Sequence, residues 1–358
     1  MGKIILQIGS LSFEEIKNSL WTEKDPYLES SLRFCRDWLR GEMLFELSTS
    51  GSTGTPKTIT VHRRQMEISA KATKDFFGIQ PNSLLLCCLS TDMIAGKMML
   101  VRALEWDADV VLVAPKENPL LELSMNREFD FAAMVPMQVA ACLDSTKTAG
   151  ELKKIKQLII GGAPISPALL EKIGMEKLNA YQTYGMTETV SHVALAKING
   201  QKPIYTALPK VGIGTDASGR LWLEAPMAQE KHLQTNDLVE LIGNNQFVWL
   251  GRADFTINSG GIKIQPEILE PQLAAIVSEF FPKSDFFLSA LEDSKFGQKL
   301  VLVIENAQPE QKRAKDLLME IRKNFHKHLV PKTVLFVSDF MRTPSGKINR
   351  RANLNIAK

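Results

Sequence analysis

Nine residues near the N-terminus, Thr49 to Lys57, combine hydroxyls, glycines and one lysine in the order TSGSTGTPK. Glycine lets the backbone approach an anion closely, hydroxyls and N–H groups donate to phosphate oxygens, and a lysine ammonium adds a mobile positive charge. A solvated linker of this composition is usually longer and does not need a terminal Pro-Lys. We therefore predict a polyphosphate-binding loop with contacts from Thr49, Ser50, Gly51, Ser52, Thr53, Gly54 and Lys57.

This loop differs from the P-loop, which reads G-x-x-x-x-G-K-[ST]. When the count begins at Gly51, the position that needs the second glycine holds Pro56, and proline has no N–H to offer a phosphate. The residues therefore indicate a phosphate-binding loop of another kind.

Five further segments carry residues that suit a nucleotide or its metal ion, namely small glycine-containing turns, carboxylates and basic residues. In chain order they are Gly161-Gly162-Ala163-Pro164, Tyr184-Gly185-Met186-Thr187-Glu188-Thr189, Asn236-Asp237, Gly251-Arg252-Ala253-Asp254 with Gly260-Gly261 and Lys263, and Arg342-Thr343-Pro344-Ser345-Gly346-Lys347. With the phosphate loop they resemble, in order and spacing, the adenylate-forming superfamily of acyl-CoA ligases, adenylation domains and luciferases. The resemblance covers residues from about 45 to 351.

The resemblance implies that ATP and a carboxylic acid form an acyl-AMP and pyrophosphate, after which the thiol of CoA displaces AMP. The first step needs positive charge between the carboxylate and the α-phosphate, and the resemblance gives this catalytic role to Lys347. Glu188 would bind Mg²⁺, which favours carboxylate and phosphate oxygens, and Thr187 would donate to the α-phosphate. Without the resemblance, the turn that holds Thr187 reads as a helix N-cap and Lys347 as one more solvated lysine.

The resemblance also implies which residues surround the nucleotide and CoA. Asp237 would accept charge-assisted hydrogen bonds from both ribose hydroxyls, and Arg252 would contact the same sugar. Asp254 stands where the family has its hinge, although an isolated aspartate there is also explained as the cap of a turn. The remaining cofactor-binding positions are Gly161, Gly162, Ala163 and Pro164 beside the adenine, Tyr184 and Gly185, and Gly260 and Gly261 along the path of CoA.

The composition limits the partners. The chain has 358 residues, 44% apolar and 23% charged, with a net charge of +3, which does not indicate nucleic acid or an anionic membrane as a partner. No apolar run approaches a transmembrane length, and the four cysteines lack zinc-type spacing or the density of a secreted scaffold. We expect a cytoplasmic protein whose partners are ATP, CoA and a small carboxylic acid.

Short apolar runs alternate with helical patterns between Leu84 and Tyr184, which predicts a largely parallel sheet covered by helices. From His192 onward short strands follow one another, including a hairpin in which Leu238–Ile242 pairs with Phe247–Leu250. We therefore predict an α/β protein with two domains. Residues 1–252 would bind ATP and the acid, and residues 253–358 would form a small mobile α+β catalytic domain.

Two departures from the superfamily concern the acid pocket. Only about 48 residues precede the phosphate loop, and the segment Ser90 to Lys97 replaces the family's aromatic-histidine motif. If the acid has a second carboxylate, the pocket must supply a cation or several donors, because an unpaired buried charge is costly. The candidates are Lys97, Ser191 and His192. The alternative is that Lys97 is solvated and His192 is a strand residue among polar neighbours.

Among the subfamilies, this chain looks most like the o-succinylbenzoate–CoA ligases of menaquinone biosynthesis. The similarity lies in the short N-terminus and in the residues of the segments Gly161 to Pro164 and Tyr184 to Thr189. Three alternatives stay open: a ligase for another aryl or short-chain acid, an adenylation enzyme that loads a carrier protein, and a non-catalytic nucleotide-binding paralogue. The last would be expected to lack Glu188, Asp237 or Lys347, and all three are present.

Overall fold

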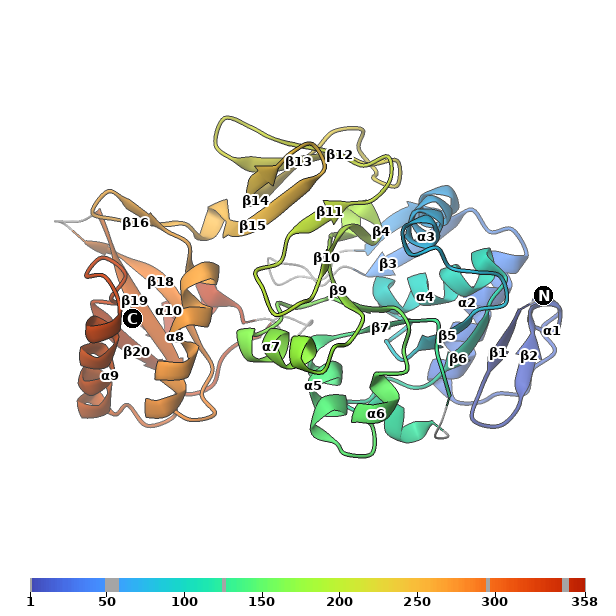
Figure 1. Ribbon diagram of the computed structural model, residues 1–358, viewed down its shortest axis with the longest axis horizontal. Helices are drawn as coiled ribbons and strands as arrows, with labels where there is room; N and C mark the ends of the chain where they lie inside the picture. The colour runs from blue at the N-terminus through green and yellow to red at the C-terminus, as the bar shows by residue number, and fades with distance from the viewer. Residues whose placement is uncertain (1, 49–57, 124–126, 294–296, 343–347, 358) are drawn as a thin grey trace.

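A computed structural model describes residues 2–48, 58–123, 127–293, 297–342 and 348–357, which form two main sheets and a separate hairpin (Figure 1). The larger sheet has thirteen strands in the order β12-β13-β14-β15-β11-β10-β9-β8-β7-β5-β6-β1-β2. The hairpin pairs β3 (Leu44–Ser48) with β4 (Thr58–His62), so the phosphate loop predicted from the sequence connects these two strands.

The middle of the larger sheet is parallel. Its strands are β1 (Lys3–Ile5), β6 (Asp109–Leu112), β5 (Leu84–Cys87), β7 (Phe131–Met134), β8 (Leu158–Ile160) and β9 (Ala180–Gly185). Their side chains are buried on both faces: Leu85 and Cys87 enter one hydrophobic core, whereas Leu86 and Cys88 enter another. Burial on both faces explains the continuous apolar runs of the sequence.

The two ends of the larger sheet are antiparallel. Beyond β9 lie β10 (His192–Lys197), β11 (Tyr205–Ala207), β15 (Gln246–Arg252), β14 (Leu233–Ile242), β13 (Arg220–Glu224) and β12 (Gly212–Thr215), and β2 (Ser10–Ser12) closes the opposite edge. The hairpin predicted from the sequence is confirmed, although β14 begins at Leu233 rather than Leu238.

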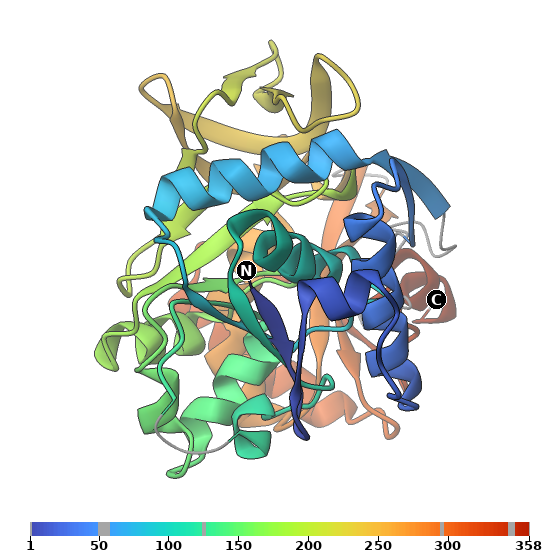
Figure 2. The ribbon, with the colours of Figure 1, turned by 90° about the vertical axis from the view of Figure 1, so that its right-hand side faces the viewer.

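Helices cover both faces of the larger sheet. They are α1 (Phe13–Lys17), α2 (Pro26–Leu39), α3 (Arg63–Phe77), α4 (Ile94–Trp106), α5 (Pro136–Asp144), α6 (Ala149–Leu152) and α7 (Pro167–Met175), with 3₁₀ turns at Pro119–Glu122, Thr187–Thr189 and Ala253–Phe255. Figure 2 shows α3 between α4 and the strands β12 to β15. Helix α4 is apolar almost all round, which is typical of a buried helix.

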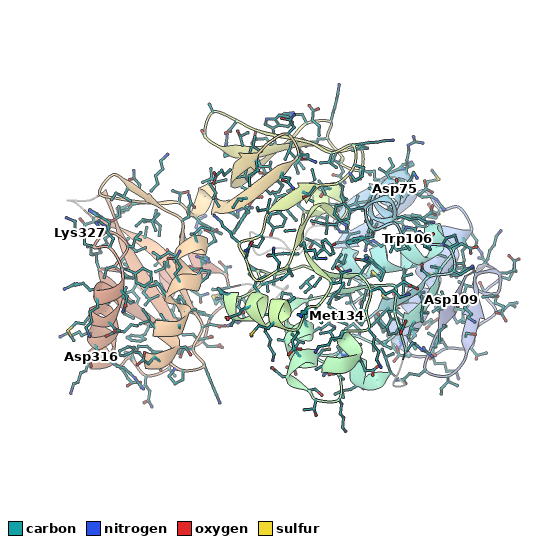
Figure 3. The ribbon with its side chains drawn as sticks, viewed as in Figure 1. Asp75, Trp106, Asp109, Met134, Asp316 and Lys327 are labelled. Carbon is teal, nitrogen blue, oxygen red and sulfur yellow. The ribbon has the colours of Figure 1, made fainter. Side chains whose placement is uncertain are left out.

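The smaller sheet has the order β17-β16-β19-β18, with β20 parallel to β19. Its elements are β16 (Ile257–Ser259), β17 (Ile262–Ile264), α8 (Pro266–Phe280), β18 (Phe286–Asp293), β19 (Gly297–Glu305), α9 (Gln311–Asn324), β20 (Thr333–Val337) and α10 (Arg350–Ala357). These elements bury hydrophobic clusters of their own. In Figure 3, Asp316 of α9 and Lys327, which follows α9, lie at the end of the molecule opposite Asp109. The predicted fold class is confirmed.

Within the described residues, every cysteine is buried and none forms a disulfide. No helix of the described part of the chain combines the length and the apolar character that a bilayer crossing needs.

The smaller sheet is joined to α10 by a partly buried ion pair. The carboxylate of Glu270 on α8 accepts hydrogen bonds from Arg350 Nη1 at 2.6 Å and Nη2 at 2.7 Å, and from the N–H of Leu288 at 2.6 Å. The side chain of Arg350 is only 22% exposed and that of Glu270 only 15%. Removing the arginine would therefore leave a carboxylate that is poorly solvated.

We predict that Arg350→Met lowers the opening free energy of β18 and β19 by about 3 kcal/mol, because breaking a buried pair strands the remaining charge. Hydrogen exchange of peptides from these strands, followed by mass spectrometry, measures this quantity. Lys323→Met is the control: Lys323 pairs with Glu320 while 70% exposed, so its loss should change the same quantity by under about 1 kcal/mol. Equal effects of the two substitutions would contradict the prediction.

Candidate functional site

Two groups of predicted site residues lie outside the described residues. They are the phosphate loop, with Thr49, Ser50, Gly51, Ser52, Thr53, Gly54 and Lys57, and the catalytic Lys347. Their roles stay predictions. The neighbouring backbone is described, since Ser48 pairs with Thr58 at the end of the hairpin and Arg342 forms a bridge with Ile348.

The chain reverses direction between β9 and β10, and this reversal carries the predicted metal ligand. Gly185 lies opposite His192, and a side chain at Gly185 would collide with the carbonyl oxygen of Ser191. Thr187 and Glu188 lie in the 3₁₀ turn at the tip, which Thr189 stabilises by accepting from the N–H of Met186 at 3.1 Å. The close approach of the two strands therefore needs glycine at position 185. Glu188, at the tip of the reversal, is exposed.

The structure brings Tyr184 and Asp237 together. The phenol of Tyr184 donates to Asp237 Oδ2 at 2.6 Å, and the indole N–H of Trp249 donates to Oδ1 at 3.1 Å. Burial, and then the carboxylate of Asp237, raises the pKa of Tyr184 well above its usual value, so the phenol stays a donor. Asp237 is thus a nearly buried carboxylate held in one orientation, with lone pairs left for further donors.

Arg252 lies on β15 directly opposite Asp237 on β14. Its guanidinium donates Nε and Nη2 to the two carboxylate oxygens of Asp254, at 2.9 and 3.0 Å. This hydrogen bond lowers the pKa of Asp254. Arg252, which is predicted to contact the ribose, and Asp254, the predicted hinge residue, are therefore joined by a bidentate ion pair.

Two further predicted segments occupy turns. Gly161, Gly162, Ala163 and Pro164 follow β8 and precede α7, and three of them are exposed. Gly260 and Gly261 connect β16 to β17 with φ of 60° and 82°. A two-residue hairpin turn with positive φ at both positions favours glycine, so the hairpin by itself explains this pair. Whether CoA passes here stays a prediction.

The three acid-pocket candidates divide into two places. Lys97 lies at the start of α4, and its Nζ is 3.4 Å from the carbonyl oxygen of Glu46 and 6.0 Å from the ring centroid of Phe34. Burial lowers the pKa of Lys97, partly offset by Asp92. Its recorded contacts are thus with α2 and β3.

Ser191 instead contacts Arg102, a residue that the sequence did not single out, and His192 is hydrogen-bonded to Ser191. Arg102 lies in the middle of α4, is 1% exposed, and donates Nη2 to Ser191 Oγ at 3.0 Å. Its Nη1 is 3.5 Å from the sulfur of Met99, and its Nε has no partner in the described part of the chain. The guanidinium lies 5.7 Å from the ring centroid of Phe131. The sequence of α4 could have revealed Arg102, because an arginine in a helix with apolar residues on almost every side cannot reach water.

Within the part of the chain that the structure describes, Arg102 is a buried cation without a carboxylate partner. Burial lowers the pKa of Arg102 to about 10. Burial, and then the nearby Arg102, lowers the pKa of His192 well below its usual value, so His192 is neutral at pH 7. The cluster of Arg102, Ser191 and His192 therefore carries one positive charge that water does not solvate.

Glu188 fits a magnesium ion that is held mainly by phosphate and water. Its carboxylate is exposed at the tip of the reversal, and the described residues contain no cluster of three or more His, Cys, Asp or Glu that would hold a metal without other ligands. Mg²⁺ commonly takes one or two carboxylates and completes its shell with phosphate oxygens and water. The donor set is compatible with this mode of binding.

We predict that the buried neutral His192 destabilises the fold in acid. The unfolded state binds a proton near pH 6.5 and the folded state does not, so stability is full above pH 6.5 and falls as the pH decreases below it. Between pH 6 and 5 the free energy of unfolding should fall by about 1 kcal/mol more in the wild type than in His192→Gln. Urea titrations followed by tryptophan fluorescence report this, since all five tryptophans precede Arg252. Parallel losses in the two proteins would show that His192 is protonated in the folded state.

Comparison with known proteins identifies the family. The sequence pattern of the AMP-binding enzymes matches residues 12–216. A 2-succinylbenzoate–CoA ligase of Lactococcus lactis subsp. lactis is 25% identical over 362 residues, covering 96% of this chain and 76% of the relative.

Solved structures give the same result. The crystal structure of an AMP-forming acyl-CoA synthetase/AMP-acid ligase II-like protein from Dyadobacter fermentans is 40% identical with a TM-score of 0.64, covering 96% of this chain and 97% of that one. The o-succinylbenzoate–CoA synthetase of Bacillus subtilis, solved with its acyl-adenylate intermediate, shares the fold with a TM-score of 0.70 at 22% identity, over 86% of this chain and 68% of that one. The predicted superfamily and the predicted class, an AMP-forming acyl-CoA synthetase, are confirmed: the chain belongs to the family of AMP-binding enzymes.

Proposed function

We propose that this acid–CoA ligase activates an aryl acid with a second carboxylate, most specifically o-succinylbenzoate in cytoplasmic menaquinone biosynthesis. The observation that carries the proposal is the buried guanidinium of Arg102. Among the described residues its polar partners are a neutral hydroxyl and a thioether, and its Nε has no partner. The names of the relatives from Lactococcus lactis and Bacillus subtilis point to the same acid.

A buried cation without a counter-ion is costly, and removing it from water is repaid only by a close partner of opposite charge. A substrate carboxylate would be such a partner, because a guanidinium N–H makes a strong, charge-assisted hydrogen bond to a carboxylate. Ser191 and His192 follow the turn of Thr187 and Glu188 by a few residues, so the chain connects the cluster directly to the proposed adenylation site. An acid with two carboxylates would span the two places.

The chain's own residues would act on ATP as follows. Asp237, oriented by Tyr184 and Trp249, would accept from the ribose hydroxyls. Thr187 would donate to the α-phosphate, and Lys347 would neutralise charge as the carboxylate attacks. Mg²⁺ would neutralise charge on the phosphates, with Glu188 as its protein ligand.

CoA would enter beside Gly260 and Gly261 after the smaller unit has turned. We place the boundary between residues 252 and 253, where the larger sheet ends and the 3₁₀ turn Ala253–Phe255 begins. The ion pair of Arg252 with Asp254 spans this boundary, so a rotation there would alter the position of Arg252 next to Asp237. Asp254 is our candidate for the hinge.

We predict that the wild type releases pyrophosphate with o-succinylbenzoate far more efficiently than with benzoate or short-chain monocarboxylic acids, and forms the thioester only when CoA is present. In Arg102→Met, the KM for o-succinylbenzoate should rise at least tenfold, the equivalent of about 1.4 kcal/mol of binding, while the KM for ATP stays near its wild-type value. Coupled pyrophosphate assays with and without CoA measure both.

Lys97→Met is the matched control, because Lys97 is the other cation of α4 and contacts different elements. A rise in the acid KM for Lys97→Met and none for Arg102→Met would move the contact to Lys97. Equal activity of the wild type with monocarboxylic acids would overturn the dicarboxylic assignment. Release of pyrophosphate without formation of a thioester, even when CoA is supplied, would favour a carrier protein as the acceptor.

We predict that Lys347→Ala slows acyl-adenylate formation by at least about 10²-fold, the usual effect of losing one preorganised electrostatic contact. Thioester formation from supplied acyl-AMP should largely persist, because that step does not attack the α-phosphate. Single-turnover assays of each half-reaction separate the two steps. An equal fall in both rates would refute this role of Lys347.

A further inference from the structure

We propose that His192 is a positioning residue for the acid: as a neutral imidazole protonated on Nε2, it turns the hydroxyl of Ser191 so that Ser191 accepts from Arg102 and leaves the guanidinium Nε for the substrate. This inference rests on the proposed function, because it concerns how the second carboxylate is recognised. Its basis is a chain of four hydrogen bonds that crosses from α4 through β10 to α3.

One end of the chain is a group that only donates. Arg102 Nη2 donates to Ser191 Oγ at 3.0 Å, so this oxygen is the acceptor. The single proton of the Ser191 hydroxyl is then available for His192 Nδ1, which lies 3.4 Å away. A donor at Ser191 requires Nδ1 to be the unprotonated nitrogen.

The other end of the chain is a group that only accepts. Thr73 Oγ1 donates to the carbonyl oxygen of Ser69 at 3.0 Å, and His192 Nε2 lies 3.1 Å from the same Oγ1. With the Thr73 proton used, Oγ1 accepts from an Nε2–H. Both ends thus give the same direction, from Arg102 through Ser191, His192 and Thr73 to the backbone of α3.

The alternative protonation states fit poorly. With the proton on Nδ1, the Ser191 oxygen would accept twice and its own O–H would have no acceptor among the described residues. A doubly protonated ring would place a second buried cation beside Arg102 without a recorded carboxylate. His192 and Thr73 are both fully or almost fully buried, so water does not replace these contacts.

The consequence of this order lies at Arg102. Its Nη2 is occupied by Ser191, its Nη1 faces the weakly accepting sulfur of Met99, and its Nε is buried and has no partner among the described residues. The hydrogen-bond chain fixes the guanidinium plane, so that the free Nε edge is presented in one orientation. Loss of the His192 acceptor would release Ser191 and, with it, that orientation.

The inference is tested with two variants. His192→Gln retains one amide donor and one amide acceptor, and its KM for o-succinylbenzoate should stay within about threefold of the wild type. His192→Leu removes both groups, and the same KM should rise about five- to tenfold, while the KM for ATP and kcat change less than twofold. A rise in both variants, or in neither, would overturn the positioning role while leaving the proposed function intact. Ser191→Ala replaces His192→Leu if that variant does not fold, with the same expected rise.

A second measurement needs no substrate. In the unliganded wild-type protein, labelled with ¹⁵N-histidine, two-bond ¹H–¹⁵N spectra at pH 7 should give a neutral Nε2–H ring that disappears in His192→Gln. The chain has only five histidines, so this difference identifies the ring. A ring protonated on Nδ1 or on both nitrogens overturns the inference. If the tautomer is as expected but monocarboxylic acids are equally good substrates, the proposed function fails and the hydrogen-bond chain stands.

Discussion

The antiparallel pairing of β9 with β10 is the contact on which the proposed site depends. The strands β5 to β9 of the larger sheet run parallel, and the reversal after Gly185 ends that pattern at the point where the carboxyl ends of the parallel strands meet. Ligands of open α/β sheets commonly bind at such an edge. The reversal places Glu188 at its tip, and it returns Ser191 and His192 toward α4 and α3.

Two buried charged side chains near this pairing, Asp237 and Arg102, differ in how well their charge is compensated by hydrogen-bond partners. Asp237 on β14 is a buried carboxylate with two donors, Tyr184 of β9 and Trp249 of β15, and its charge is well accommodated. Arg102 on α4, hydrogen-bonded to Ser191 before β10, is a buried cation whose partners among the described residues are neutral. The buried charge of Asp237 is therefore stabilised without a ligand, whereas a bound anion would further stabilise the buried charge of Arg102. This difference is the physical ground for expecting an acid with a spare carboxylate.

Much of the fold follows from sequence pattern. The apolar runs at β5, β6 and β8 and the hairpin of β14 and β15 are predicted because side-chain burial on two faces and turn residues leave a local signal. The order of the strands leaves no such signal, since pairing β5 between β6 and β7 depends on contacts between distant segments. The start of β14 is missed because Gln234 and Asn236 interrupt its apolar alternation.

The site follows from sequence less completely, and for similar reasons. Motifs such as Tyr184 to Thr189 are contiguous, so their resemblance to a family identifies them directly. The Trp249 donor to Asp237 and the Arg102 contact with Ser191 join positions 12 and 89 residues apart, and neither donor stands in a motif. Lys97 is the more conspicuous cation of α4 because it opens the helix beside a variant loop, yet burial distinguishes Arg102.

The most direct measurement is a crystal structure of this chain with the acyl-adenylate of o-succinylbenzoate. We predict that the unreacted carboxylate lies about 3 Å from Arg102 Nε, at ordinary hydrogen-bond distance, with Ser191 still bound to Nη2. A carboxylate that points into solvent, or that pairs with Lys97 while Arg102 keeps its present contacts, would contradict it.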